Sequence, residues 1–172
     1  MEFLVVFDFD ATLIKTTLPD VGKGMWSSHH GIEYPHVGWW GRKESLDSDV
    51  FDNDMNDWVH DQYKTCVDRG YSKILLTGRM KKLRNEVNSV LDKHNIDMDG
   101  VYLSSGNTLS YKLYKMNQII EQNKETLEKV VLYDDRLEHN SEFVEWSNSI
   151  KELYGIEVIV DLIIDGVGEY VL

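Results

Sequence analysis

Cysteine and proline are almost absent from this chain, and each shortage excludes a class of protein. One cysteine in 172 residues excludes an intrachain disulfide and a zinc site built from several thiolates, and it fits a reducing compartment. Two prolines and twelve glycines leave no long flexible linker. No run reaches the ~18 apolar residues that a membrane helix needs, and the apolar opening at 1–7 lacks the length and basic flank of a signal peptide. We therefore expect an intracellular, cytoplasmic protein with no membrane partner.

Basic residues are also scarce. The chain has 18 Lys and Arg against 30 Asp and Glu, which gives a formal net charge of −12 at pH 7. A protein that grips a polyanion along its length needs a basic surface, so this balance argues against bulk binding to nucleic acid. Residues 15–43 run against the trend, with four basic and two acidic side chains. The composition therefore still allows a local basic mouth over a single phosphate.

Five short apolar runs have the length of buried strands, and helical periodicity fills the sequence between them. The apolar runs are 2–7, 72–77, 100–104, 129–133 and 156–162. Apolar residues at helical spacing mark 55–67, 83–94, 113–120 and 143–153. Strands that alternate with helices imply right-handed crossovers and a parallel sheet covered on both faces. The prediction is a single domain over 1–172, with a doubly wound, Rossmann-like α/β fold of about five parallel strands.

Residues 14–51 interrupt this alternation. The segment contains both prolines, three of the six histidines and the sequence Gly38-Trp-Trp-Gly41. Long loops in a compact domain are usually functional, and this one follows the first strand. We interpret 14–51 as a loop insertion, too short for a helical cap, that acts as a small lid. Because one helix and one strand use up residues 80–111, the expected domain has a minimal cap or none, with an open mouth.

Polar side chains follow four of the apolar runs, at the strand ends where ligands bind in open α/β sheets. They are Asp8 and Asp10, Thr77, Lys112, and Asp134 and Asp135. The carboxylates of Asp8, Asp134 and Asp135 can stay ionised together in one pocket only if a cation neutralises them, and all-oxygen ligands favour Mg²⁺. Asp10 lies two residues beyond Asp8, so an extended chain would point both side chains toward a common centre.

Together these motifs resemble those of the haloacid dehalogenase (HAD) superfamily. The pattern Asp8-x-Asp10-x-Thr12, the strand that ends in Thr77, then Lys112, and the strand that ends in Asp134-Asp135 follow the family's order across residues 3–136. The resemblance implies an HAD-like fold and a Mg²⁺-dependent phosphomonoester hydrolase. The Asp at position 10 is typical of the phosphatases and phosphotransferases of the family, whereas the dehalogenases and ion pumps lack it.

The resemblance also implies a role for each residue. Asp8 would be the nucleophile that forms an aspartyl-phosphate, and Asp10 would be the general acid that later acts as a base. Thr77 and Lys112 would hold the transferring phosphoryl group. The Mg²⁺ ligands would be Asp8, the backbone carbonyl of Asp10, Asp134, and Asp135 directly or through water.

Thr77-Gly-Arg79, Asp134-Asp-Arg136 followed by His139, and a Trp-rich stretch after the first motif mark one subgroup more narrowly. They resemble the HAD domain of Swiss Army Knife RNA-repair proteins and also the phosphatase half of viral polynucleotide kinase-phosphatases. This resemblance implies removal of a terminal 3′-phosphate from RNA or DNA ends during repair. The candidate substrate-binding residues are Thr12, Gly78, Arg79, Arg136, His139, Trp39 and Trp40. The chain departs from the subgroup in being acidic and in having no kinase or ligase segment among these 172 residues.

Five of these candidate substrate-binding residues also have a simpler interpretation. Trp39 and Trp40 would pack the segment down as a hydrophobic plug, instead of stacking on a base. Arg79 and Arg136 would pair with neighbouring acids, and His139 would be a polar residue at the start of a helix. For the whole chain, the alternatives are a phosphatase of nucleotides or other small phosphorylated metabolites, a phosphotransferase, and a non-catalytic scaffold that binds phosphorylated partners.

Overall fold

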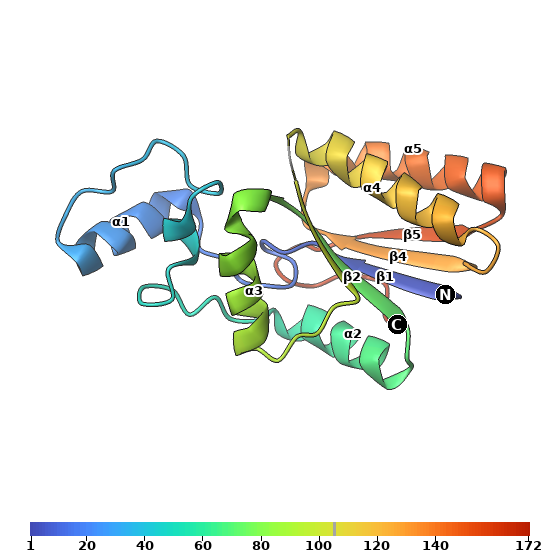
Figure 1. Cartoon of the computed structure of the whole chain (residues 1–172), viewed down its shortest axis with the longest axis horizontal. Helices are drawn as coiled ribbons and strands as arrows, with labels where there is room; N and C mark the ends of the chain where they lie inside the picture. Colours follow the sequence, from blue (N-terminus) through green and yellow to red (C-terminus); the bar gives the residue numbers. More distant parts are fainter. Residues whose placement is uncertain (105) are drawn as a thin grey trace.

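The computed structural model describes residues 1–104 and 106–172 and places five strands in one sheet. The strands are β1 (Phe3–Phe7), β2 (Ser72–Met80), β3 (Gly100–Ser104), β4 (Lys129–Asp134) and β5 (Glu157–Leu162). Their order across the sheet is β3-β2-β1-β4-β5, and every neighbouring pair is parallel. The predicted doubly wound α/β fold is confirmed (Figure 1).

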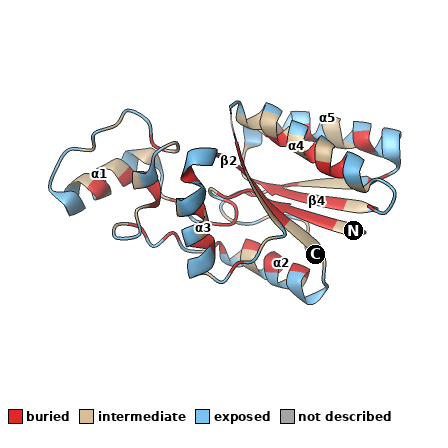
Figure 2. Ribbon diagram, viewed as in Figure 1, coloured by how far each residue is buried: buried red, intermediate tan, exposed pale blue. Residues whose placement is uncertain are grey.

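Helices cover both faces of the sheet. One face carries α2 (Asp57–Asp68) and α3 (Arg84–Lys93), and the other carries α4 (Thr108–Asn123) and α5 (Leu137–Tyr154). Within β1, Val5 and Phe7 pack in the first core, while Leu4 and Val6 pack in the second, because successive side chains point to opposite faces. Each such side chain contributes about 1.5–3 kcal/mol by its burial. The central strands are buried, as their red colour in Figure 2 shows, and β1 is therefore apolar throughout instead of alternating.

The helices carry no membrane segment in the part of the chain that the structure describes. None of them combines the length and the hydropathy that are needed to cross a bilayer.

The strand order reverses between β1 and β4, which is where ligands bind in open α/β sheets. From β1 the chain passes to β2 and β3 on one side, and then returns to β4 and β5 on the other side. Helices leave the sheet in opposite directions at such a reversal, so the carboxyl ends of β1 and β4 are free to face a ligand.

Residues 14–51 differ from the expected irregular loop, because they contain a helix, α1 (Pro19–His30), and a short 3₁₀ turn, η1 (Lys43–Leu46). Proline suits the first turn of a helix, where its missing N–H is not needed. Gly31 ends the helix in the left-handed conformation, with φ 69°, and its N–H donates to the Ser27 carbonyl. Figure 1 shows this α1 lobe beyond the edge at which the strands end.

The α1 lobe has a small core of its own, built from Trp26, Trp39 and Phe51. Trp39 is only 3 % exposed, and its indole N–H donates to the Thr17 carbonyl at 2.8 Å. Gly22 permits this packing, since a Cβ at that position would lie 2.3 Å from the Trp39 ring. Trp39 is therefore a packing residue with no free face for a base, as the plug interpretation holds. That the lobe closes over the site as a lid stays a prediction.

Candidate active site

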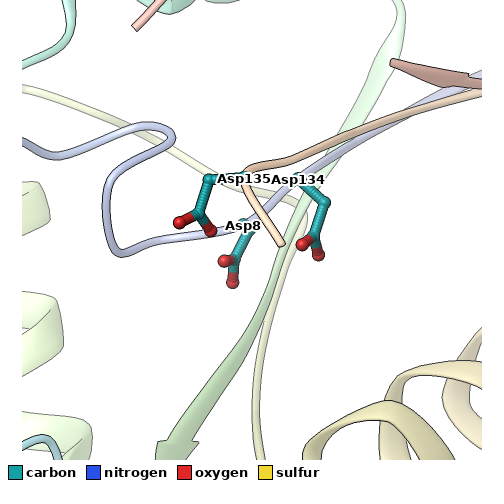
Figure 3. Close-up of side chains that lie close together, drawn as sticks. All are labelled: Asp8, Asp134 and Asp135. Carbon is teal, nitrogen blue, oxygen red and sulfur yellow. The ribbon is translucent and has the colours of Figure 1, made fainter. Parts of the chain in front are cut away.

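Asp8 and Asp134 emerge side by side from two paired strands. Asp8 directly follows β1, and its N–H donates to the Tyr133 carbonyl of β4 at 3.0 Å, so the main chains are still joined where the side chains emerge. Asp135 follows β4, and one oxygen from each of the three carboxylates lies within 4.8 Å of the other two. Figure 3 shows the three carboxylates directed to the same side of the chain. The structure thus gathers the carboxylates that were expected in one crevice.

Lys112 reaches this carboxylate cluster (Asp8, Asp134 and Asp135) from α4. Its Nζ lies 2.8 Å from Asp8 Oδ1 and 2.5 Å from Asp134 Oδ2, and its side chain is fully buried. The helix is anchored nearby, because the Asn107 side chain caps its start by accepting the N–H of Ser110 at 3.0 Å. A rigid helix start therefore fixes the direction from which the ammonium enters the site.

Burial and like charges disturb the protonation of the cluster. Burial raises the pKa of Asp8 to about 8, since desolvation and the charges of Asp134 and Asp135 outweigh the attraction of Lys112. Burial, helped by Asp134, also raises the pKa of Asp135 to about 6. Burial alone would lower the pKa of Lys112, but Asp8 and Asp134 raise it above its usual value. Three carboxyls that face one ammonium leave the cluster short of positive charge.

A divalent cation would supply the positive charge that the cluster lacks. Asp8, Asp134 and Asp135 are the residues that would hold it, and carboxylate oxygens are the hard ligands that Mg²⁺ prefers. Asp8 Oδ1 is buried, and among residues 1–104 and 106–172 it has no hydrogen-bond partner of ordinary geometry, although Lys112 Nζ lies 2.8 Å away. A buried oxygen in this state keeps a lone pair available for a metal ion.

The Asp10 carboxylate is held by Arg79 and is not one of the three carboxylates whose oxygens lie within 4.8 Å of one another. Arg79 Nε donates to the two oxygens of Asp10 at 3.2 and 2.9 Å, and Nη2 donates to Oδ1 at 2.7 Å. Ala11 has a φ of 53°, so the chain turns directly after Asp10, and a common centre for the Asp8 and Asp10 carboxylates stays a prediction. The metal-ligand role of the Asp10 backbone carbonyl, which the resemblance implies, also stays a prediction.

Arg79 is itself held by the α1 lobe. Its Nη1 donates to the Trp40 carbonyl at 2.9 Å and to Ser45 Oγ, and the Trp40 ring lies 5.1 Å from the guanidinium carbon. The side chain is fully buried, so it orients Asp10 instead of facing a phosphate in solvent. The interpretation of Arg79 as the partner of a neighbouring acid describes this geometry, although the guanidinium is buried and the carboxylate is partly exposed. Sequence reasoning missed Ser45, because nothing near this serine marks it.

Three other predicted residues lie around the ends of β1 and β2. Thr77 is buried, and its Oγ1 accepts the N–H of Arg79 at 3.1 Å. Thr12 is fully buried, and its hydroxyl has no hydrogen-bond partner among the described residues. Gly78 has to be small, because a Cβ there would lie 2.8 Å from the Thr108 side chain. These positions support the turn around the carboxylate cluster, and their contact with a substrate stays a prediction.

Arg136 and His139 follow the cluster in the chain. The N–H of Arg136 donates to Asp134 Oδ1 at 3.0 Å, while its half-exposed guanidinium lies 3.7 Å from the Glu138 carboxylate. His139 Nδ1 is buried without a partner among the described residues, and burial lowers the pKa of this imidazole. The backbone of Arg136 therefore orients a metal-site carboxylate, and a role for either side chain in substrate binding stays a prediction.

Comparison with solved structures identifies the fold. The chain resembles one in the Pnkp1/Rnl/Hen1 complex (TM-score 0.57, 19 % identity), with 93 % of this chain and 45 % of that chain covered. It resembles a haloacid dehalogenase-like hydrolase, SP0104 from Streptococcus pneumoniae (TM-score 0.50, 14 % identity, coverage 92 % and 93 %). It also resembles the HAD domain of the effector Lem4 from Legionella pneumophila (TM-score 0.51, 16 % identity, coverage 94 % and 85 %). The fold is that of the HAD superfamily.

A sequence comparison places the chain in one family of this superfamily. The sequence profile of HAD domain family 1 in Swiss Army Knife RNA repair proteins matches residues 25–163, and the chain belongs to this family. The matched range includes Arg79, Lys112 and Asp134 but begins after Asp8 and Asp10. No curated protein matches the sequence. The chain spans less than half of the chain that it resembles in the Pnkp1/Rnl/Hen1 complex. Family membership supports a hydrolase.

The raised pKa values give a testable link between pH and stability. Between about pH 4 and pH 8 the metal-free folded chain keeps a proton on Asp8 that the unfolded chain has lost, so the free energy of unfolding falls as pH rises. Asp8→Asn removes this titration. We expect the variant to gain stability relative to the metal-free parent by at least about 1 kcal/mol between pH 5 and pH 8.

Urea unfolding of both proteins at pH 5, 6, 7 and 8, with and without Mg²⁺, measures this difference. Mg²⁺ should stabilise the parent more at pH 8 than at pH 5. Parallel pH curves for parent and variant would contradict the raised pKa of Asp8.

Proposed function

We propose that this chain is a Mg²⁺-dependent phosphomonoesterase that acts through an aspartyl-phosphate on Asp8 and removes 3′-phosphates from RNA or DNA ends. The observation that carries the proposal is the meeting of Asp8 with Lys112, Asp134 and Asp135 at the carboxyl edge of the sheet. Membership of an HAD family in RNA repair proteins supports both the hydrolase class and the substrate class.

The first step of the proposed reaction transfers the phosphoryl group to Asp8. A carboxylate oxygen of Asp8 attacks phosphorus, the bond to the leaving oxygen breaks, and Asp10 gives that oxygen a proton. Lys112 Nζ, 2.8 Å from Asp8 Oδ1, is placed to donate to an oxygen of the transferred group. When bound, Mg²⁺ supplies positive charge that keeps Asp8 ionised and offsets the charge of the phosphate.

The second step releases phosphate. Water attacks phosphorus, Asp10 takes the proton of that water, and the bond between phosphorus and Asp8 breaks. Asp10 serves both steps only if its carboxylate stays in one place, and the Arg79 pair supports this because a two-point contact fixes orientation. Asp8 is held by the cluster and Asp10 by Arg79. Two carboxylates in different surroundings can take different roles, here Asp8 as the nucleophile and Asp10 as the proton carrier.

A nucleic-acid end is favoured over a small metabolite by the charge of residues 15–43, the first part of the α1 lobe, whereas residues 44–51 add three acidic side chains. Residues 15–43 hold four basic and two acidic side chains in a chain of net charge −12, and the lobe lies beyond the edge that carries Asp8. An extended anionic substrate would pass over this lobe while its terminal phosphate reaches the cluster.

The proposed function is tested with three substrates side by side: a 3′-phosphorylated oligonucleotide, its 5′-phosphorylated counterpart and a mononucleotide. With Mg²⁺ we expect kcat/KM for the 3′-phosphorylated end to exceed the others by about tenfold or more. Asp8→Asn and removal of Mg²⁺ with a chelator should each reduce turnover by about 10³-fold or more, since the nucleophile or its charge is lost.

Asp68→Asn is the matched control, because Asp68 is exposed at the end of α2, and it should keep full activity. Equal and weak turnover of all three substrates would favour a small-metabolite phosphatase. No turnover with Mg²⁺ would favour a scaffold that binds phosphorylated partners. Full activity in Asp8→Asn would refute the nucleophile assignment.

The contact between Ser45 and Arg79 predicts a dependence on the leaving group. Ser45→Ala removes one partner of Arg79, which loosens the hold on Asp10 and weakens proton donation. An alkyl phosphate needs that proton more than 2,4-dinitrophenyl phosphate does, so we expect kcat/KM to fall about tenfold for the first and less than about twofold for the second.

Ser48→Ala, at an exposed serine of the same lobe, is the control and should change neither value. An equal loss for both substrates in Ser45→Ala would mean that Ser45 supports only the fold.

A further inference from the structure

A cavity adjoins the carboxylate cluster. This side cavity has a volume of about 390 Å³ and is lined by the turn after β1, the start of α5 and the chain beyond β5. Its lining includes Ala11, Asp135, Leu137, Ile163, Ile164 and Asp165. Asp135 belongs both to the side cavity and to the cluster, so the two sites adjoin. In Figure 3 the Asp135 carboxylate lies on the side of the loop that follows β1.

The rim of the side cavity is apolar and open to solvent. Leu137 is 71 % exposed and Ile164 is 62 % exposed, although both are large aliphatic side chains. Single exposed aliphatic residues are ordinary on protein surfaces. Two that line one cavity beside a cluster of carboxylates are suited to covering the apolar part of a molecule whose polar part lies at the cluster.

Both rim residues stand on fixed backbone. Leu137 is the first residue of α5. Ile164 precedes a two-residue turn, Asp165-Gly166, in which φ is 50° and 82° and the backbones of Ile164 and Val167 exchange hydrogen bonds of 2.9 and 3.0 Å. This is the Asp-Gly turn of tight hairpins, which holds its flanking side chains in place. The rim is therefore preformed, and a ligand would not have to order it.

The polar side chains that line the side cavity are hydrogen-bond acceptors. Asp165 and Asp135 offer carboxylate oxygens, and no Lys or Arg is among the described residues that line it. A second phosphate is therefore excluded by repulsion, whereas a planar ring that carries N–H donors fits aliphatic walls and a carboxylate. We propose that the side cavity is a nucleobase subsite, which holds the base of the terminal nucleotide while its 3′-phosphate lies at Asp8. This inference rests on the proposed function and specifies which part of the substrate is recognised.

Guanosine 3′-phosphate and glycerol 2-phosphate test the inference, since both are secondary alkyl phosphates and only the first carries a base. Leu137→Ser and Ile164→Ser should each lower the ratio of the two kcat/KM values about tenfold, through a higher KM for the nucleotide. Leu153→Ser is the matched control, because Leu153 is 70 % exposed at the far end of the same helix, and it should leave the ratio unchanged.

Binding gives a second measurement that does not depend on turnover. Calorimetry with guanosine 3′-phosphate and Asp8→Asn in the presence of Mg²⁺ should show about tenfold weaker binding when Leu137→Ser is added. If both substrates are hydrolysed and the ratio does not move, the nucleobase subsite is refuted while the phosphatase proposal stands. If neither is hydrolysed, the phosphatase proposal fails, and equal affinity with and without Leu137→Ser refutes the subsite as well.

Discussion

Three carboxylates share one ammonium at the edge of the sheet, and the chemistry of this chain depends on that imbalance. Asp8, Asp134 and Lys112 meet because β1 and β4 are paired and α4 packs on the same face as α5. Burial makes each uncompensated charge costly. The cluster can lower that cost by keeping a proton or by taking a cation. Only the binding of a cation leaves Asp8 ionised as a nucleophile. Stability, metal dependence and reactivity are therefore linked through one group of side chains.

The second constraint is the pair of Asp10 and Arg79. Asp10 lies two residues along the chain from Asp8, yet its carboxylate has a different set of contacts, because Arg79 holds it. Trp40 and Ser45 of the α1 lobe hold the arginine from behind. The lobe therefore contributes to the placement of the proposed proton carrier, and a residue that touches no substrate is expected to influence proton transfer.

Much of this arrangement could be predicted from the sequence. Strands buried on both faces leave continuous apolar runs, and polar residues such as Asp8 and Asp134 at their ends mark the carboxyl edge. The helix α1 could not be predicted, because Gly22 and Gly24 lower its propensity and it is stabilised by packing on Trp39. The partner of Arg79 could not be predicted either, since Ser45 lies 34 positions away and meets it only in the folded chain.

The most direct test of the central claim is a calorimetric titration of the chain with Mg²⁺ at pH 7, in two buffers of different ionisation enthalpy. The account predicts that a single ion binds and releases about one proton, because the carboxyls with raised pKa values must lose their protons to become ligands. Binding should disappear in Asp134→Asn. No binding, or binding without proton release that survives Asp134→Asn, would contradict the claim that these three carboxylates form the metal site.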